Sequence, residues 1–140
     1  MHLSEKEKNI IIKFLKSKID PKLIYLYGSY AKGETREDSD IDWAVYTDED
    51  INAYDLFIIS NQLSHELKKE VQIVNLKHLD TVFAAQIIAY REELYSSDDF
   101  LAISYNMKTL REYAKLNEER KVVLDAIKRD GRIYRWRYFI

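Results

Sequence analysis

The chain has 140 residues and contains no cysteine, only one proline and only three glycines. The absence of cysteine excludes disulfide bonds, thiolate zinc sites and cysteine nucleophiles, and it fits a reducing cytoplasm. The few chain-breaking residues, Pro21, Gly28, Gly33 and Gly131, leave no segment with the composition of a linker. We therefore expect a single domain over residues 1–140 and a cytoplasmic location.

The sequence also lacks long apolar runs and a strong excess of either charge. Its apolar stretches are far shorter than the roughly 20 residues that a membrane-spanning helix needs, and the polar first eight residues do not resemble a secretory signal. Lys and Arg number 22 and Asp and Glu number 24, a net charge of −2, which argues against broad binding to nucleic acids. With 46% hydrophobic and 33% charged residues, the chain is expected to be globular, without a membrane partner.

Hydrophobic periodicity predicts an alternation of helices and strands. Ser4 and Glu7 have the spacing of a capping box at the start of the first helix, and Asp98 is placed to cap a long C-terminal helix. The expected fold class is α+β, with a small mixed β-sheet of three or four strands, helices packed on one face, and the long C-terminal helix. The predicted helices cover residues 4–18, 51–67, 80–90 and the segment from 98 to Gly131, and the predicted strands cover residues 23–27, 40–46 and 71–76.

Two short polar motifs flank the connection between the first two predicted strands. Gly28 and Ser29 directly follow an apolar strand, and Asp40 and Asp42 come after ten further residues. Glycine lets the backbone approach a ligand closely. Backbone N–H groups at such a turn, and the hydroxyl of Ser29, can donate hydrogen bonds to phosphate oxygens. The first motif therefore predicts a phosphate-binding turn.

The second motif predicts a magnesium site. Side chains alternate along a strand, so Asp40 and Asp42 point to the same face of the sheet. Two neighbouring carboxylates repel each other unless a cation lies between them, and Mg²⁺ prefers oxygen ligands supplied by carboxylates and substrate phosphates. If the connection brings both motifs together, the site is suited to in-line attack on a phosphorus atom.

The same residues resemble a known signature. Gly28-Ser29, ten residues and Asp40-x-Asp42 are similar to the motif of the DNA polymerase β-like nucleotidyltransferases. The longer segments GSYAKG, SDIDWAV and VQIVNLKHLDTVFAAQII resemble the minimal nucleotidyltransferases (MNT), and above all the MntA-type antitoxins, over nearly the whole chain.

This resemblance implies a polymerase β-like fold and a magnesium-dependent protein adenylyltransferase. Such an enzyme transfers AMP from ATP to a tyrosine hydroxyl of a partner HEPN-family ribonuclease toxin, and so neutralises the toxin in a hetero-oligomer. The resemblance assigns Asp40 and Asp42 to catalysis and metal binding, and Gly28, Ser29, Lys32 and Ser39 to the nucleotide.

The sequence departs from this family at the third predicted strand, where a third carboxylate is usual. The aligned residue is Gln72, and a neutral amide cannot act as a base. A tyrosine hydroxyl with its ordinary pKa of about 10 needs help from a base or a metal to react at neutral pH. Glu70 is expected on the same strand face, roughly 6–7 Å away along the strand, and is a possible substitute.

Two other functions therefore stay open. The first is a catalytically weak or inactive antitoxin that neutralises its toxin by binding alone. The second is a nucleotidyltransferase that acts on a small molecule such as an aminoglycoside.

Two further features each allow more than one interpretation. Tyr30 follows the first motif, so it either lines the nucleotide pocket or packs in the core. The C-terminal segment KRDGRIYRWRYFI interleaves arginines with aromatic residues, which is typical of protein contact surfaces. The same segment would equally suit a final strand or tail packed on the domain, and direct nucleic-acid recognition ranks below both.

Overall fold

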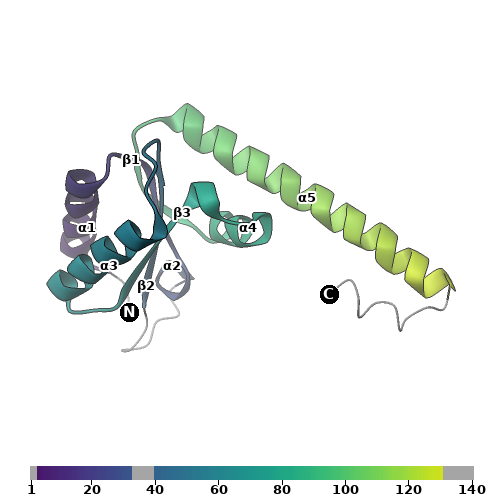
Figure 1. Ribbon diagram of the computed structural model, residues 1–140, viewed down its shortest axis with the longest axis horizontal. Helices are drawn as coiled ribbons and strands as arrows, with labels where there is room; N and C mark the ends of the chain where they lie inside the picture. Colours follow the sequence, from purple (N-terminus) through teal and green to yellow (C-terminus); the bar gives the residue numbers. More distant parts are fainter. Residues whose placement is uncertain (1–2, 33–39, 131–140) are drawn as a thin grey trace.

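The computed structural model describes residues 3–32 and 40–130, and the elements within these ranges are drawn in Figure 1. The first helix begins where the sequence predicts it, because the Ser4 side chain accepts from the Glu7 backbone N–H and Glu7 accepts from that of Ser4. In chain order the elements are α1 (Glu5–Lys18), β1 (Pro21–Tyr27), α2 (Ser29–Lys32), β2 (Ile41–Thr47), α3 (Ala53–Leu67), β3 (Val71–Asn75), a 3₁₀ turn η1 (Leu76–His78), α4 (Thr81–Ala89), β4 (Glu92–Ser96) and α5 (Asp99–Asp130).

The four strands form one mixed sheet in the order β3-β2-β1-β4. β1 pairs antiparallel with β2 on one side and with β4 on the other, whereas β2 pairs parallel with β3. The parallel pair requires a crossover, and α3 supplies it. The predicted mixed sheet, α+β class and long C-terminal helix are confirmed.

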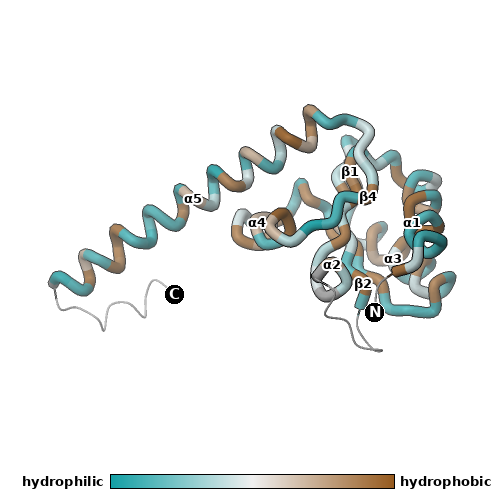
Figure 2. The backbone as a smooth tube through the Cα atoms, turned by 180° about the vertical axis from the view of Figure 1, so that it is seen from behind, coloured by the Kyte–Doolittle hydropathy of each residue, from teal (hydrophilic) through white to brown (hydrophobic). Residues whose placement is uncertain are grey.

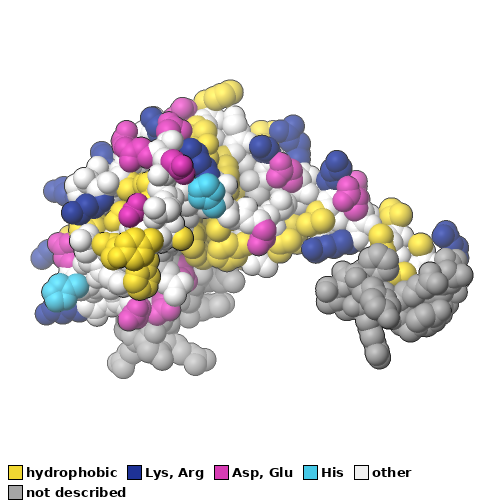
Figure 3. Space-filling model, in the orientation of Figure 1, with side chains coloured by type: hydrophobic (Ala, Val, Ile, Leu, Met, Phe, Trp, Pro, Cys, Tyr) yellow, Lys and Arg dark blue, Asp and Glu magenta, His cyan; other side chains and the backbone are white. Residues whose placement is uncertain are grey.

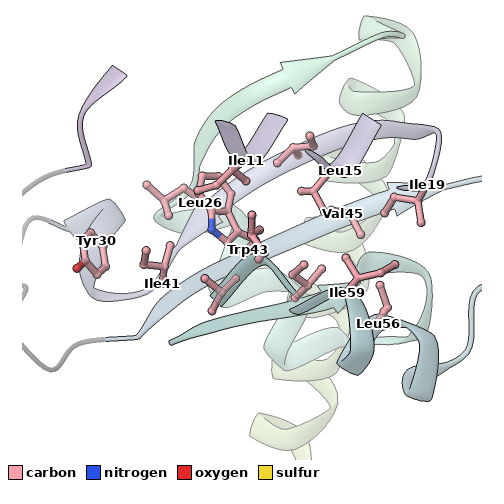
Figure 4. Close-up of a cluster of buried hydrophobic side chains, with 14 of the residues drawn as sticks. Ile11, Leu15, Ile19, Leu26, Tyr30, Ile41, Trp43, Val45, Leu56 and Ile59 are labelled. Atoms are coloured by element: carbon pink, nitrogen blue, oxygen red, sulfur yellow. The ribbon is translucent and has the colours of Figure 1, made fainter. Parts of the chain in front are cut away.

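One face of the sheet carries the larger hydrophobic cluster, which α1 and α3 cover (Figure 4). Trp43 lies at its centre and is fully buried, with Ile11 and Leu15 of α1 packed in the same cluster. Tyr30 is only 3% exposed and belongs to this cluster too. Of the two interpretations of Tyr30, the structure therefore supports the core residue.

The opposite face of the sheet is also covered, which corrects the expectation that the helices pack on one face only. Leu23, Tyr25 and Ala44 point to this second face and pack with Ile87 of α4 and Ala102 of α5. Figure 1 shows α1 and α3 on one side of the sheet and α4 and α5 on the other. The prediction missed this because long-range packing is not encoded in local periodicity.

The helix α5 has 32 residues, which corresponds to about 48 Å, and it extends well past the sheet (Figure 1). Its first half is anchored: Tyr25 donates a hydrogen bond of 3.1 Å to Asn106, and Tyr105 donates one of 2.8 Å to the Leu76 carbonyl. Beyond Thr109, none of the side chains that the structure describes on this helix is buried. Seen from behind, hydrophobic and hydrophilic residues alternate along its length (Figure 2).

Residues 131–140, which make up most of the C-terminal segment predicted as a contact surface, lie outside the described residues, and so does Gly131, the predicted end of the last helix. Within the ranges that are described, no helix is long and apolar enough to cross a membrane.

Candidate active site

The antiparallel pairing of β1 and β2 brings the two polar motifs together. Tyr27, the last residue of β1, is the Cα partner of Asp42, and Gly28 follows directly. A Cβ atom placed on Gly28 would lie only 2.5 Å from Oδ2 of Asp42. Gly28 also has φ +72°, in the left-handed region that side chains other than glycine rarely adopt. Both the close approach and the backbone conformation therefore require glycine here.

Asp42 lies on the sheet face that α4 and α5 cover. Strand alternation places it in line with Ala44, which is fully buried on that face. Burial raises the pKa of the Asp42 carboxyl to about 6, and the nearby charge of Asp40 adds to the rise. Asp40, which immediately precedes β2, is half-buried.

The donor set formed by these two side chains suits a hard cation. Both offer carboxylate oxygens, and a positive ion would offset the burial and repulsion that hold the Asp42 pKa high. Magnesium is commonly held by one or two carboxylates together with substrate phosphates, so two protein ligands are enough. Among residues 3–32 and 40–130, no group of three or more His, Cys, Asp or Glu side chains could hold a metal ion.

The residue beside Asp42 on the next strand is Gln72. The two are Cα partners in the parallel pairing of β2 with β3, and the Gln72 side chain is exposed. Glu70 precedes β3, and its backbone carbonyl accepts a hydrogen bond of 2.9 Å from the Ile41 N–H. Since no third acidic side chain is grouped with Asp40 and Asp42 in the described structure, Glu70 does not complete a three-carboxylate cluster.

The remaining residues that the sequence analysis assigns to the nucleotide are only partly described. Ser29 begins α2 and Lys32 ends it, so both lie on the short helix that follows Gly28. Their side chains, and all of Ser39, lie outside what the structure describes.

Sequence reasoning missed a cavity that opens beside Gly28. Its volume is about 640 Å³, and α4 and α5 form most of its wall. Tyr27, the last residue of the first predicted strand, forms part of the lining and makes an edge-to-face contact with Phe83, with ring centroids 5.9 Å apart. Burial, and then the charge of Asp42, raise the pKa of Tyr27 to about 12. The lining residues are Tyr27, Gly28, Phe83, Ala85, Gln86, Ile87, Ala89, Tyr90, Leu110 and Tyr113.

The fold and the paired motifs define a nucleotidyltransferase, and comparison with known proteins agrees. The chain belongs to the polymerase beta nucleotidyltransferase family, whose model matches residues 9–100. Among curated proteins, the protein adenylyltransferase MntA of Shewanella oneidensis is 32% identical over 129 residues, which are 89% of this chain and 90% of the relative.

Solved structures give the same result. A chain of a toxin–antitoxin crystal structure with AMP-PNP superposes with a TM-score of 0.77 at 30% identity, over 86% of this chain and 98% of that one. A chain of the tri-AMPylated Shewanella oneidensis HEPN toxin in complex with MNT antitoxin gives 0.75 at 27% identity, over 90% and 99%. The resemblance stated from the sequence is thus confirmed.

Proposed function

We propose that this chain is an antitoxin that transfers AMP from ATP to a tyrosine hydroxyl of a partner HEPN-family toxin and so neutralises it. Family membership supports the nucleotidyl transfer. The name of the curated relative, protein adenylyltransferase MntA, supports AMP and a protein acceptor. Two similar structures, one with AMP-PNP and one with an AMPylated HEPN toxin, support the nucleotide and the partner.

The observation that carries the proposal is the contact between Gly28 and Asp42. Only a hydrogen on Gly28 leaves room for the Asp42 carboxylate, so the turn that we propose binds phosphate lies against one of the two carboxylates. Asp40 and Asp42 would hold Mg²⁺. Gly28 and Ser29 would bind the triphosphate through backbone N–H groups and the serine hydroxyl, and this proposal includes Lys32 and Ser39 as further phosphate contacts.

The reaction then needs orientation more than covalent chemistry from the protein. Bound magnesium would offset the negative charge on the phosphates. The tyrosine oxygen forms a bond to the α-phosphorus, and the bond from that phosphorus to the bridging oxygen breaks. Pyrophosphate leaves with the electron pair, and the hydroxyl proton passes to water. Gln72 cannot accept this proton, so we expect a slower reaction than a third carboxylate would allow.

The test uses the purified protein, a candidate HEPN-family toxin, magnesium and ATP labelled on the α-phosphate. We expect label on the toxin with the wild type and none with Asp40→Asn or Asp42→Asn. Asp48→Asn is the matched control, because the Asp48 side chain is 70% exposed and pairs with Lys22 at 3.9 Å, away from the motifs. Equal labelling by the wild type and Asp42→Asn would refute the assignment of the carboxylates.

A second candidate function rests on Gln72, which lies in register with Asp42 where the resemblance implies a third acid. On this proposal the protein neutralises its toxin by forming a complex, without modifying it. Asp42→Asn would then still neutralise the toxin, and truncation before Gly131 would abolish neutralisation. An unlabelled toxin that is nevertheless inhibited by the wild type would favour this candidate over AMP transfer.

A further inference from the structure

We propose that the cavity between the end of β1, α4 and α5 is the acceptor subsite, which takes the tyrosine side chain of the protein that receives AMP. This inference rests on the proposed function, because it assumes a tyrosine acceptor. Apart from Gly28, none of the described residues that line this cavity belongs to either sequence motif.

The position of the cavity connects it to the site of transfer. Gly28 and Tyr27 form one wall, and Gly28 is the residue that touches Asp42. A side chain inserted here would reach Gly28, and so the neighbourhood of the Asp42 carboxylate. The opposite wall comes from α4 and α5, through residues such as Phe83, Leu110 and Tyr113.

The chemistry of the lining suits a neutral aromatic group. None of the ten described residues that line the cavity is charged, so the cavity offers no counter-charge for a triphosphate. Tyr27 and Phe83 already form an edge-to-face pair. A further aromatic ring can pack against this pair in the same edge-to-face geometry. Gln86 can donate or accept a hydrogen bond within the same cavity.

An adenine ring would also suit an aromatic cavity, but the surroundings favour a protein. Leu110 is 46% exposed and continues along α5 into an exposed apolar ridge with Met107 and Ile103, which are 56% and 58% exposed. These residues recur at the spacing of one helix face. Figure 3 shows hydrophobic side chains that extend from the sheet-bearing part onto this long helix. A nucleotide would leave this ridge uncovered, whereas the residues around an acceptor tyrosine could pack on it.

The first measurement is independent of catalysis. The methyl signals of Ala89 and Leu110 are followed by NMR while N-acetyl-tyrosinamide or adenosine is added to the full chain. We expect N-acetyl-tyrosinamide to shift both signals, with no change at Ile58 on α3, and we expect Tyr113→Ala to weaken that binding about fivefold or more. Shifts caused by adenosine alone would overturn the inference in favour of a base-binding cavity, and no shift with either probe would also overturn it.

The second measurement separates acceptor from nucleotide. In the AMP-transfer assay, Tyr113→Ala should raise KM for the toxin about tenfold, the loss expected for one aromatic contact. KM for ATP should stay within about twofold. Tyr54→Ala is the control, since Tyr54 is a 69% exposed tyrosine on α3, across the sheet. A rise in KM for ATP with no change for the toxin would overturn the inference. A wild type that transfers no AMP would refute the proposed function, while the NMR result would still decide the cavity.

Discussion

Replacing Gly28 by alanine tests the contact on which the proposed active site depends. The residue has φ +72°, a conformation that costs an L-residue roughly 1–2 kcal/mol. The added Cβ would lie 2.5 Å from Oδ2 of Asp42, so the carboxylate must turn away at a cost on the order of 0.5–1.5 kcal/mol. We therefore expect Gly28→Ala to lower the free energy of unfolding by about 1.5–3.5 kcal/mol, and the melting temperature by roughly 5–14 °C.

A double-mutant cycle separates the two contributions. In an Asp42→Ala background the carboxylate is gone, so Gly28→Ala should cost only the backbone part, about 1–2 kcal/mol. The measurement is urea denaturation of all four proteins, followed by circular dichroism, together with AMP transfer by Gly28→Ala at a temperature where it remains folded. Transfer should fall on the order of 100-fold, because the displaced carboxylate no longer lies where the substrate is bound.

Two outcomes would refute this reasoning. If Gly28→Ala costs the same in both backgrounds, the glycine and the carboxylate do not touch. If the variant is folded and fully active, the close approach of Gly28 has no role in the reaction.

Three further predictions follow from individual residues. In a metal-free buffer Asp42→Asn should raise the free energy of unfolding by about 1 kcal/mol at pH 8. This is less than the pKa shift of Asp42 alone implies, because the carboxyl is only half-buried and solvent screens its charge. The Asp42 pKa is raised from 3.8 to about 6, so the folded state binds the proton more tightly than the unfolded state. The free energy of unfolding of the wild type should therefore fall as pH rises from 4 through 6. A free energy of unfolding that does not change over this range would contradict the raised pKa of Asp42. Gln72→Asp should increase the rate of AMP transfer about tenfold or more by restoring a carboxylate beside Asp42, and a slower single-turnover rate would show that this position does not assist the reaction. Lys68→Gly should raise the free energy of unfolding by roughly 0.5–1 kcal/mol, since Lys68 caps the C-terminal end of α3 with φ 57°. A lower melting temperature for this variant would mean that the lysine side chain contributes more than its backbone strain costs.

Local signals in the sequence were enough to predict most of the elements. The capping box of Ser4 is confirmed, and the Asp80 and Asp98 side chains accept from the backbone N–H groups of Phe83 and Leu101 at 2.8 and 3.0 Å. Such contacts span three residues, so they depend on little besides the neighbouring sequence.

Long-range arrangements were harder to predict. The strand β4, which pairs with β1, is half-exposed and carries Glu92 and Glu93, so it lacks the apolar alternation of the other strands. The cavity beside Gly28 is formed by residues more than fifty positions apart, such as Tyr27 and Phe83. The spacing of the two motifs along the sequence was enough to locate them. The cavity wall formed by α4 and α5 could be identified only once the positions of these helices were known.

The pairing of Tyr27 with Asp42 also fixes how far apart the two motifs lie. Because strand hydrogen bonds hold both residues, the register of β1 with β2 sets the separation of Gly28 and Asp42. Side chains alternate along a strand, so a slip of this register by one residue would turn the side chains of β2 to the opposite face of the sheet. The proposed site therefore depends on the same register that buries Trp43 in the core, and a mutation that disturbs the core at Trp43 should also displace Asp42.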